Sequence, residues 1–156
     1  MRDQAGWGLR RPEDYAGERG GYAPWCGPTA VAQAAGLSYT HACALLTWIS
    51  PDRYPPGQEI VTAWWSDLVT ALHRAGVPTE AGPMPGRPTL CQAARSLAPG
   101  WWMLRVTGHF LLLHVTTDGA YVFDNRLHGE RLSAKTNGRR RVTHAARLAE
   151  GPRLPS

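Results

Sequence analysis

Residues 25–30 read Trp25-Cys26-Gly27-Pro28-Thr29-Ala30, and they set the architecture that we expect for the rest of the chain. Proline is favoured in the first turn of a helix, and the small residues that continue to Ala35 end at Gly36, a common helix terminator. The pattern predicts a short, closely packed helix with Cys26 at its N-terminal edge. Unpaired backbone N–H groups and the positive end of the helix dipole favour a thiolate there, so Cys26 is a candidate nucleophile.

Helices are expected first along the chain and strands afterwards. Apolar residues recur at three- and four-residue steps between residues 39 and 49 and again between 60 and 75, and Thr89 is a favourable cap for a short helix. After Pro99-Gly100 the sequence is rich in aromatic and aliphatic residues, and Asp118-Gly119 is a hairpin signal. The predicted fold class is therefore α+β, with N-terminal helices followed by an antiparallel β-sheet. The expected strands are residues 101–107, 109–116 and 119–123.

Two further side chains with the chemistry of a thiol hydrolase lie on the predicted hairpin. His109 begins one strand, in Gly108-His109-Phe110-Leu111-Leu112, and Asp124 follows the partner strand 15 residues later. A carboxylate at this position can lie beside the imidazole across the ladder and orient it. Asn125 is an alternative, but neighbouring strand residues face opposite sides of a sheet, and we expect Asp124 to face His109. His114 lies an odd number of residues from His109 and is expected on the opposite face.

The residues around the candidate nucleophile and base resemble the papain-like cysteine peptidase superfamily. Cys26-Gly27-Pro28-Thr29-Ala30 and Gly108-His109-Phe110-Leu111-Leu112 look most like the motifs of compact bacterial peptidases that process bacteriocins carrying a double-glycine leader. Gly36-Leu37-Ser38-Tyr39 and Tyr121-Val122-Phe123-Asp124 are similar to stretches in small proteins of phages and mobile elements. The resemblance extends over residues 20–126.

This resemblance implies a papain-like fold and a thiol hydrolase that cleaves a peptide or isopeptide bond through an acyl-enzyme. Cys26 would be the nucleophile, His109 the general base and acid, and Asp124 the group that orients the imidazole. Capture of the same acyl-enzyme by an amine would make the protein an acyltransferase. A protein or peptide is the expected partner, and neither a cofactor nor a metal ion is expected.

The segment before the cysteine departs from the papain-like pattern. Papain-like enzymes usually carry a glutamine there, whose amide helps to hold the oxyanion. This chain has Gly20-Gly21-Tyr22-Ala23-Pro24 instead, so Tyr22 becomes the candidate oxyanion donor, with Gln4 and Gln33 as alternatives. The residues expected to contact substrate adjoin the nucleophile and the base: Trp25, Gly27 and Gly108.

The composition fits one globular domain. The chain has 156 residues, of which 43% are hydrophobic and 19% charged, and this balance excludes a disordered or coiled-coil protein. We expect residues 1–20 to form an irregular N-terminal arm, 21–142 a single papain-like domain, and 143–156 a C-terminal tail. The three cysteines match no disulfide or zinc pattern, and Cys43 and Cys91 are expected in the core. No run of about 18 apolar residues indicates a membrane span, so we expect a cytoplasmic protein, or a virion protein if a phage encodes it.

The net charge of +5 is concentrated near the C-terminus. Residues 126–156 hold eight Arg or Lys against two Glu, a balance of +6, which leaves −1 for residues 1–125. We expect this charge, densest at Arg139-Arg140-Arg141, to concern a partner or a location and not the chemistry. It also supports a second hypothesis: a catalytically idle papain-like module of a phage or mobile element, whose basic end contacts nucleic acid or an acidic partner.

Overall fold

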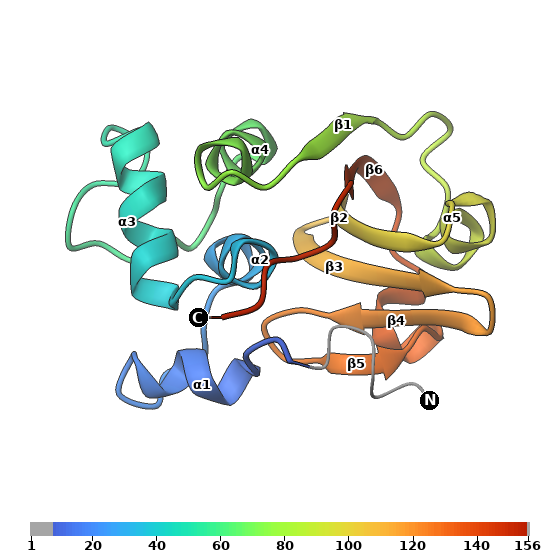
Figure 1. Cartoon of the computed structure of the whole chain (residues 1–156), viewed down its shortest axis with the longest axis horizontal. Helices are drawn as coiled ribbons and strands as arrows, with labels where there is room; N and C mark the ends of the chain where they lie inside the picture. Colours follow the sequence, from blue (N-terminus) through green and yellow to red (C-terminus); the bar gives the residue numbers. More distant parts are fainter. Residues whose placement is uncertain (1–7, 156) are drawn as a thin grey trace.

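The computed structural model describes residues 8–155 and shows helices packed against a six-stranded sheet (Figure 1). The helices are α1 (Pro12–Gly17), α2 (Cys26–Ala35), α3 (Tyr39–Ile49), α4 (Trp65–Arg74) and α5 (Leu90–Ser96). The strands are β1 (Thr79–Pro83), β2 (Gly100–Val106), β3 (His109–Thr116), β4 (Gly119–Phe123), β5 (His128–Arg131) and β6 (Val142–Leu148). A short irregular helical turn, η2 (Ala134–Gly138), separates β5 from β6. Within residues 8–155, no helix is long and apolar enough to cross a bilayer.

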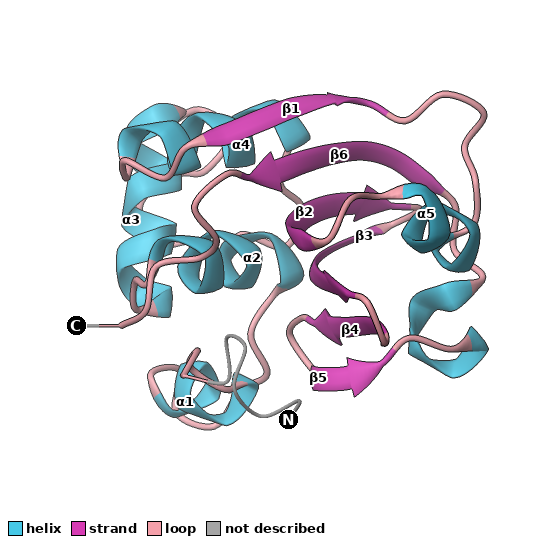
Figure 2. Ribbon diagram, turned by 45° about the vertical axis from the view of Figure 1, so that its right-hand side comes forward, coloured by secondary structure: helices cyan, strands magenta, loops and turns pink. Residues whose placement is uncertain are grey.

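The sheet brings the two predicted hairpin residues to one end. Its strand order is β1-β6-β2-β3-β4-β5, and every neighbouring pair is antiparallel (Figure 2). β2 and β3 form a hairpin through Thr107-Gly108, and β3 and β4 form the next one through residues 117–118. His109 begins β3 and Asp124 directly follows β4, and antiparallel neighbours run in opposite directions. The two residues therefore lie at the same end of the sheet.

Apolar side chains cover both faces of the sheet. On one face, α2, α3 and α4 pack against strand residues that include Met103 and Phe123. On the other face, Leu90 of α5 packs with the apolar residues of β2, β3 and β4. α2 is enclosed by its neighbours, since every residue from Gly27 to Ala35 is buried. This enclosure fixes the position of the first residue of α2, Cys26, against the sheet.

α2, α3, α5 and the strands β2 to β4 confirm the predicted elements and the α+β class. The helix expected over residues 60–75 begins only at Trp65. The preceding residues 60–64 form neither helix nor strand, and the backbone N–H of Trp64 donates to the Tyr54 hydroxyl at 2.9 Å. Ile60 still packs in the helix-side core although its backbone is not helical, whereas Trp64 is exposed, so only part of the predicted apolar stripe faces the core.

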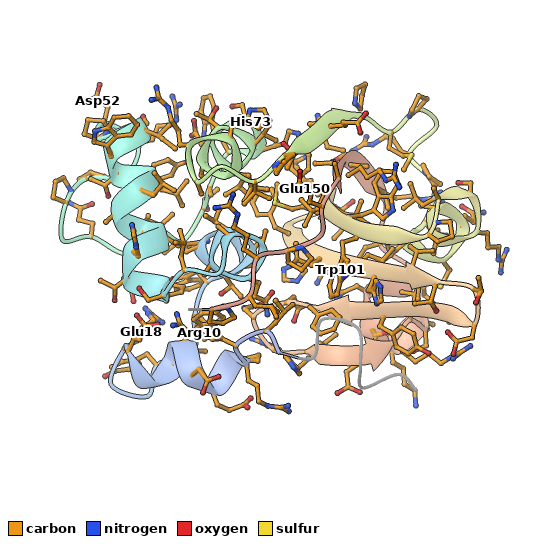
Figure 3. The ribbon with its side chains drawn as sticks, in the orientation of Figure 1. Arg10, Glu18, Asp52, His73, Trp101 and Glu150 are labelled. Atoms are coloured by element: carbon orange, nitrogen blue, oxygen red, sulfur yellow. The ribbon has the colours of Figure 1, made fainter. Side chains whose placement is uncertain are left out.

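The arm expected at residues 1–20 is not irregular throughout. Its first seven residues lie outside the described residues, but α1 forms within it, and Tyr15 is only 1% exposed in the helix-side core. Glu18 accepts hydrogen bonds from the backbone N–H groups of Tyr39 and Thr40, at 2.9 and 3.1 Å, at the start of α3 (Figure 3). Contacts with the rest of the protein stabilise this short helix, and a local pattern cannot show such contacts.

The prediction of a C-terminal tail over residues 143–156 is wrong in its first half. β6 lies inside the sheet and pairs with β1 on one side and β2 on the other. Beyond it, the N–H of Arg153 donates to the carbonyl of Ala34 at 2.9 Å, and its guanidinium donates to the carbonyls of Ala75 and Gly76. β6 has the sequence Val-Thr-His-Ala-Ala-Arg-Leu, which lacks a strict alternation of apolar and polar residues, so pairing on both edges determines its conformation more than its local pattern does. β1 and β5, also unpredicted, form the sheet edges.

Candidate active site

Cys26 is the first residue of α2, and the chain enters the helix from an extended N-cap residue, Trp25, whose side chain makes no cap hydrogen bond. Pro28 has no N–H, so the first turn offers the N–H groups of Cys26 and Gly27 to an anion. The Cys26 side chain is half-buried. α2 packs on β3, and Cys26 at its N-terminus borders the same hollow as His109 and Phe110 at the start of that strand.

His109 connects the thiol to the carboxylate. Its Nε2 atom lies 2.8 Å from Oδ2 of Asp124, and its side chain is 13% exposed. The imidazole also lies next to the Cys26 thiol, and each group shifts the pKa of the other. Because Asp124 occupies Nε2, the nitrogen that faces the sulfur is Nδ1. The structure thus brings together the three residues that the sequence placed in one site.

Four hydrogen bonds hold the Asp124 carboxylate, which is 4% exposed. Oδ2 accepts from His109 and, at 3.3 Å, from the side-chain amide of Asn137. Oδ1 accepts from the backbone N–H groups of Arg126 and Leu127, at 2.8 and 2.7 Å. A buried carboxylate with its acceptor positions satisfied stays ionised and cannot rotate freely.

The three groups shift one another's proton affinity. Burial raises the pKa of the Cys26 thiol, but hydrogen bonds from His109 and from the Phe110 N–H lower it, and the net pKa is below the ordinary value. Burial lowers the pKa of His109, yet its bonds to Asp124 and Cys26 outweigh burial and raise it to about 9. Burial raises the pKa of Asp124, whereas the bond from His109 and the backbone N–H groups lower it further than burial raises it. All three directions favour a thiolate beside an imidazolium.

Two asparagines near the carboxylate have different contacts. Asn125, the alternative to Asp124, donates from Nδ2 to the carbonyl of Pro24 at 3.1 Å and so ties the end of β4 to the segment before the nucleophile. Asn137 was not predicted as a site residue. Its only local signal is the turn dipeptide Asn137-Gly138, and its left-handed φ of 72° fits such a turn. Nothing in the sequence connects that turn with Asp124.

Two hollows meet at the imidazole. The first, of about 190 Å³, contains Cys26 and is walled by residues 61–63. The second, of about 380 Å³, lies on the Asp124 side. Gly108 and His109 border both hollows. A third hollow, of about 500 Å³, shares Thr62, Ala63 and Arg105 with the first and extends it away from the thiol.

The structure places the remaining predicted site residues differently. Tyr22 is 74% exposed and borders, with Trp25, a separate hollow that does not include Cys26. Gly27 is buried, and a Cβ atom on it would lie 2.8 Å from Cβ of Ala63, so α2 packs tightly there and substrate has no space beside it. The tight packing against Ala63 gives Gly27 a structural role in α2. Gly108 is exposed and has a φ of +69°, which suits glycine.

Of the two alternative oxyanion donors, the structure describes only Gln33, which is not near the thiol. Gln4 lies outside the described residues. Gln33 is 1% exposed and lies seven residues beyond Cys26 on α2, about 10 Å along the helix axis. The backbone N–H of Cys26 is therefore the donor that the geometry provides.

Other candidate groups are used structurally. His114 stacks, with ring centroids 4.3 Å apart, on Trp101, which belongs to the helix-side core and is labelled in Figure 3. Burial raises the pKa of the Cys43 thiol to about 11, and Cys91 is half-buried beside Gly138. Among residues 8–155, no three His, Cys, Asp or Glu side chains gather in a metal-binding arrangement.

Comparison with known proteins supports the fold assignment. No family model matches the sequence, and no curated protein matches it. Among solved structures, the chain is similar to a double glycine motif protease from an AMS/PCAT transporter, whose crystal structure contains the leader peptide. The TM-score is 0.54 at 11% sequence identity, and the match covers 83% of this chain and 85% of that chain. The protein therefore has the papain-like fold of a double-glycine motif protease, as its two short motifs indicated.

Proposed function

We propose that the protein is a cysteine peptidase that cleaves a peptide bond through an acyl-enzyme on Cys26. One observation carries the proposal: His109 contacts Asp124 through Nε2 and the Cys26 thiol through its other side, at the N-terminus of a buried helix. This arrangement favours a resting thiolate–imidazolium pair, which is the activated form of a cysteine nucleophile.

In the first half-reaction, the Cys26 sulfur attacks the carbonyl carbon of the scissile bond. The backbone N–H of Cys26 stabilises the negative charge that develops on the carbonyl oxygen. As the C–N bond breaks, Nδ1 of His109 gives its proton to the departing nitrogen. The amine product leaves, and the acyl group remains on the sulfur as a thioester.

In the second half-reaction, the neutral imidazole of His109 takes a proton from water while the water oxygen bonds to the acyl carbon. The C–S bond then breaks, which releases the acid product and restores the thiolate and the imidazolium. Asp124 stays ionised and holds the imidazole in position throughout. An amine in place of water would give acyl transfer by the same steps.

The size of the hollow around the thiol supports a small residue before the scissile bond. This hollow measures about 190 Å³, and Ala63, Arg105 and Phe110 restrict it. The solved neighbour is a double glycine motif protease that was crystallised with a leader peptide. We therefore take a peptide with two glycines before the cleaved bond as the first substrate to test, with Gly108 and Trp25 as further contacts.

Two measurements test this function. The protein should cleave a peptide containing a double glycine, and both Cys26→Ala and His109→Ala should remove that activity. Without a known substrate, iodoacetamide should alkylate Cys26 much faster than Cys43 near neutral pH, and His109→Ala should remove the difference. Equal alkylation of the two thiols would contradict an activated nucleophile.

A catalytically idle papain-like module remains the competing hypothesis, because neither Tyr22 nor a glutamine lies in the hollow of Cys26 among the described residues. The buried His109–Asp124 pair weighs against it. Burial of two charges contributes little to stability on its own, whereas a perturbed acid and base beside a thiol is typical of active sites. Slow alkylation of Cys26 in the intact protein would favour the idle module.

A further inference from the structure

The hollow on the Asp124 side of the imidazole carries positive charge. Arg126, Lys135 and Arg140 all border it. None of these three side chains forms an ion pair within residues 8–155. The carboxylate in its lining, Asp124, is already paired with His109. The three cations are therefore uncompensated where they face the hollow.

One of these cations is held in place beside the base. Nη1 of Arg140 donates to the carbonyl of Thr107 at 2.9 Å, and the same atom lies 3.9 Å from the position that a Cβ on Gly108 would occupy. A guanidinium has five N–H donors, so this contact leaves several for a ligand. The positive charge that the sequence concentrates after residue 125 thus reaches the candidate active site.

The direction of proton transfer shows which part of a substrate would meet these cations. In the proposed reaction His109 protonates the departing nitrogen, so the segment after the scissile bond must pass beside the imidazole. The acyl group bonds to Cys26, so we assign the hollow that contains Cys26 to the acyl part of the substrate. The hollow bordered by Lys135 and Arg140 is thus the place for the first residues of the leaving segment.

We propose, on the basis of the proposed peptidase function, that the protein selects peptides with Asp or Glu in the first residues after the cleaved bond. Carboxylates there would form charge-assisted hydrogen bonds with Arg126, Lys135 and Arg140. The field of the three cations would also attract an acidic segment. A hollow of about 380 Å³ fits a few side chains, which favours a peptide over an extended nucleic acid as its ligand.

The direct test uses three peptides that share a double-glycine segment and continue after it with Glu-Glu, Gln-Gln or Lys-Lys. We expect kcat/KM to fall in that order, by about tenfold from the first to the last at low salt, and the difference to shrink as salt screens the charges. Lys135→Glu should reduce or reverse the preference. Arg140→Glu should act in the same direction and provides a second variant if the first folds poorly.

Arg95→Glu is the matched control. It makes the same change in net charge at an exposed residue in the last turn of α5, which borders a different hollow. This variant should keep the preference of the unmodified protein. Equal kcat/KM for all three peptides would overturn the proposal. So would an equal loss of the preference for the acidic peptide in Arg95→Glu and Lys135→Glu.

A second readout separates this proposal from the proposed function and needs no peptide turnover. The rate of Cys26 alkylation by neutral iodoacetamide reports activation of the thiol, and the ratio of the iodoacetate rate to the iodoacetamide rate reports the local charge. We expect Lys135→Glu to lower that ratio about threefold and Arg95→Glu to leave it unchanged. An unchanged ratio with a fast iodoacetamide rate would overturn the acidic preference alone, whereas a slow iodoacetamide rate would count against the peptidase.

Nucleic acid is the alternative ligand for these cations. A single-stranded oligonucleotide should leave the alkylation of Cys26 unaffected at physiological salt. If it instead protects Cys26, with a steep loss of protection as salt rises and none in Lys135→Glu, the cations serve nucleic-acid binding and the acidic-peptide proposal is wrong.

Discussion

The Nε2 atom of His109 lies 2.8 Å from Oδ2 of Asp124, and this hydrogen bond determines which nitrogen faces the nucleophile. With Nε2 donating to a buried carboxylate, Nδ1 is left for the thiol of Cys26. The carboxylate also stabilises the positive charge on the ring. One contact thus controls both the orientation and the proton affinity of the base.

The first prediction concerns the pH dependence of peptide cleavage. The imidazolium of His109 has a pKa raised to about 9, and the thiol of Cys26 has a pKa below its ordinary value. Both charged forms coexist between these two pKa values, which belong to the coupled pair. As the pH increases, activity should therefore rise when the pH passes the lowered pKa of the thiol. It should fall again near pH 9, where the imidazolium loses the proton that the leaving amine needs.

Alkylation provides the contrast to that profile. Iodoacetamide needs only the thiolate, so its rate should not fall above pH 9. Asp124→Asn removes the charge that raises the pKa of His109, and the basic limb of kcat/KM should move to lower pH while kcat drops about a hundredfold or more. A basic limb that stays in place in Asp124→Asn would show that another group titrates there.

The catalytic geometry was predictable where local patterns encode it. A proline-containing helix start defines the place of Cys26, and a hairpin signal between two apolar runs brings His109 and Asp124 to one sheet end. β6 and η2 have no comparable signal, because a strand of Ala, Thr and Arg depends on its two neighbours for its conformation. Arg140 and Asn137 reach the site through those two elements, so their roles depend on tertiary structure.

The second prediction concerns Asn137, whose amide donates to Oδ2 of Asp124 at 3.3 Å. We expect it to be a positioning residue that acts through Asp124. Asn137→Gly keeps the backbone conformation at φ 72° accessible and removes the donor. It should lower kcat about fivefold to tenfold, with KM little changed, and shift the basic limb of the pH profile, because Asp124 loses one of its four hydrogen bonds.

Asn137→Ala separates strain from the hydrogen bond. It removes the same donor but adds the strain of a left-handed alanine, so it should unfold at a lower temperature than Asn137→Gly and show the same pH profile. If Asn137→Gly leaves both kcat and the pH profile unchanged, the contact with Asp124 has no part in the reaction.

The third prediction concerns the contact between α2 and the wall of the thiol hollow. A Cβ atom on Gly27 would lie 2.8 Å from Cβ of Ala63, well inside van der Waals contact. Gly27→Ala should therefore destabilise the protein by about 1–3 kcal/mol, measured by denaturant unfolding, although alanine favours a helix. Ala63→Gly in the same chain should restore most of the loss. Failure of this rescue would mean that the cost comes from another contact of Gly27.

The fourth prediction concerns Asp67, whose hydrogen bonds reach through Tyr54 to Trp64. Trp64 directly follows residues 61–63, which wall the thiol hollow. The Asp67 carboxylate accepts hydrogen bonds from Nε and Nη2 of Arg53, at 2.9 and 2.8 Å, and from the Tyr54 hydroxyl at 2.6 Å. The Tyr54 hydroxyl in turn accepts the backbone N–H of Trp64. Asp67→Asn should lower the free energy of unfolding by about 2 kcal/mol near neutral pH, because it removes a charge from a mostly buried network.

The pH dependence of that loss gives the sharper test. The hydrogen bonds from Arg53 hold the pKa of Asp67 below its ordinary value despite burial, so its carboxylate stabilises the fold above the unfolded pKa. This contribution is lost as pH falls through the lowered pKa, since the folded state must then bind a proton. The difference in thermal stability between the unmodified protein and Asp67→Asn should therefore shrink on acidification from neutral pH to about pH 3. A difference that stays constant over this range would mean that the carboxylate charge contributes nothing, and that shape alone holds residues 60–64 beside the thiol.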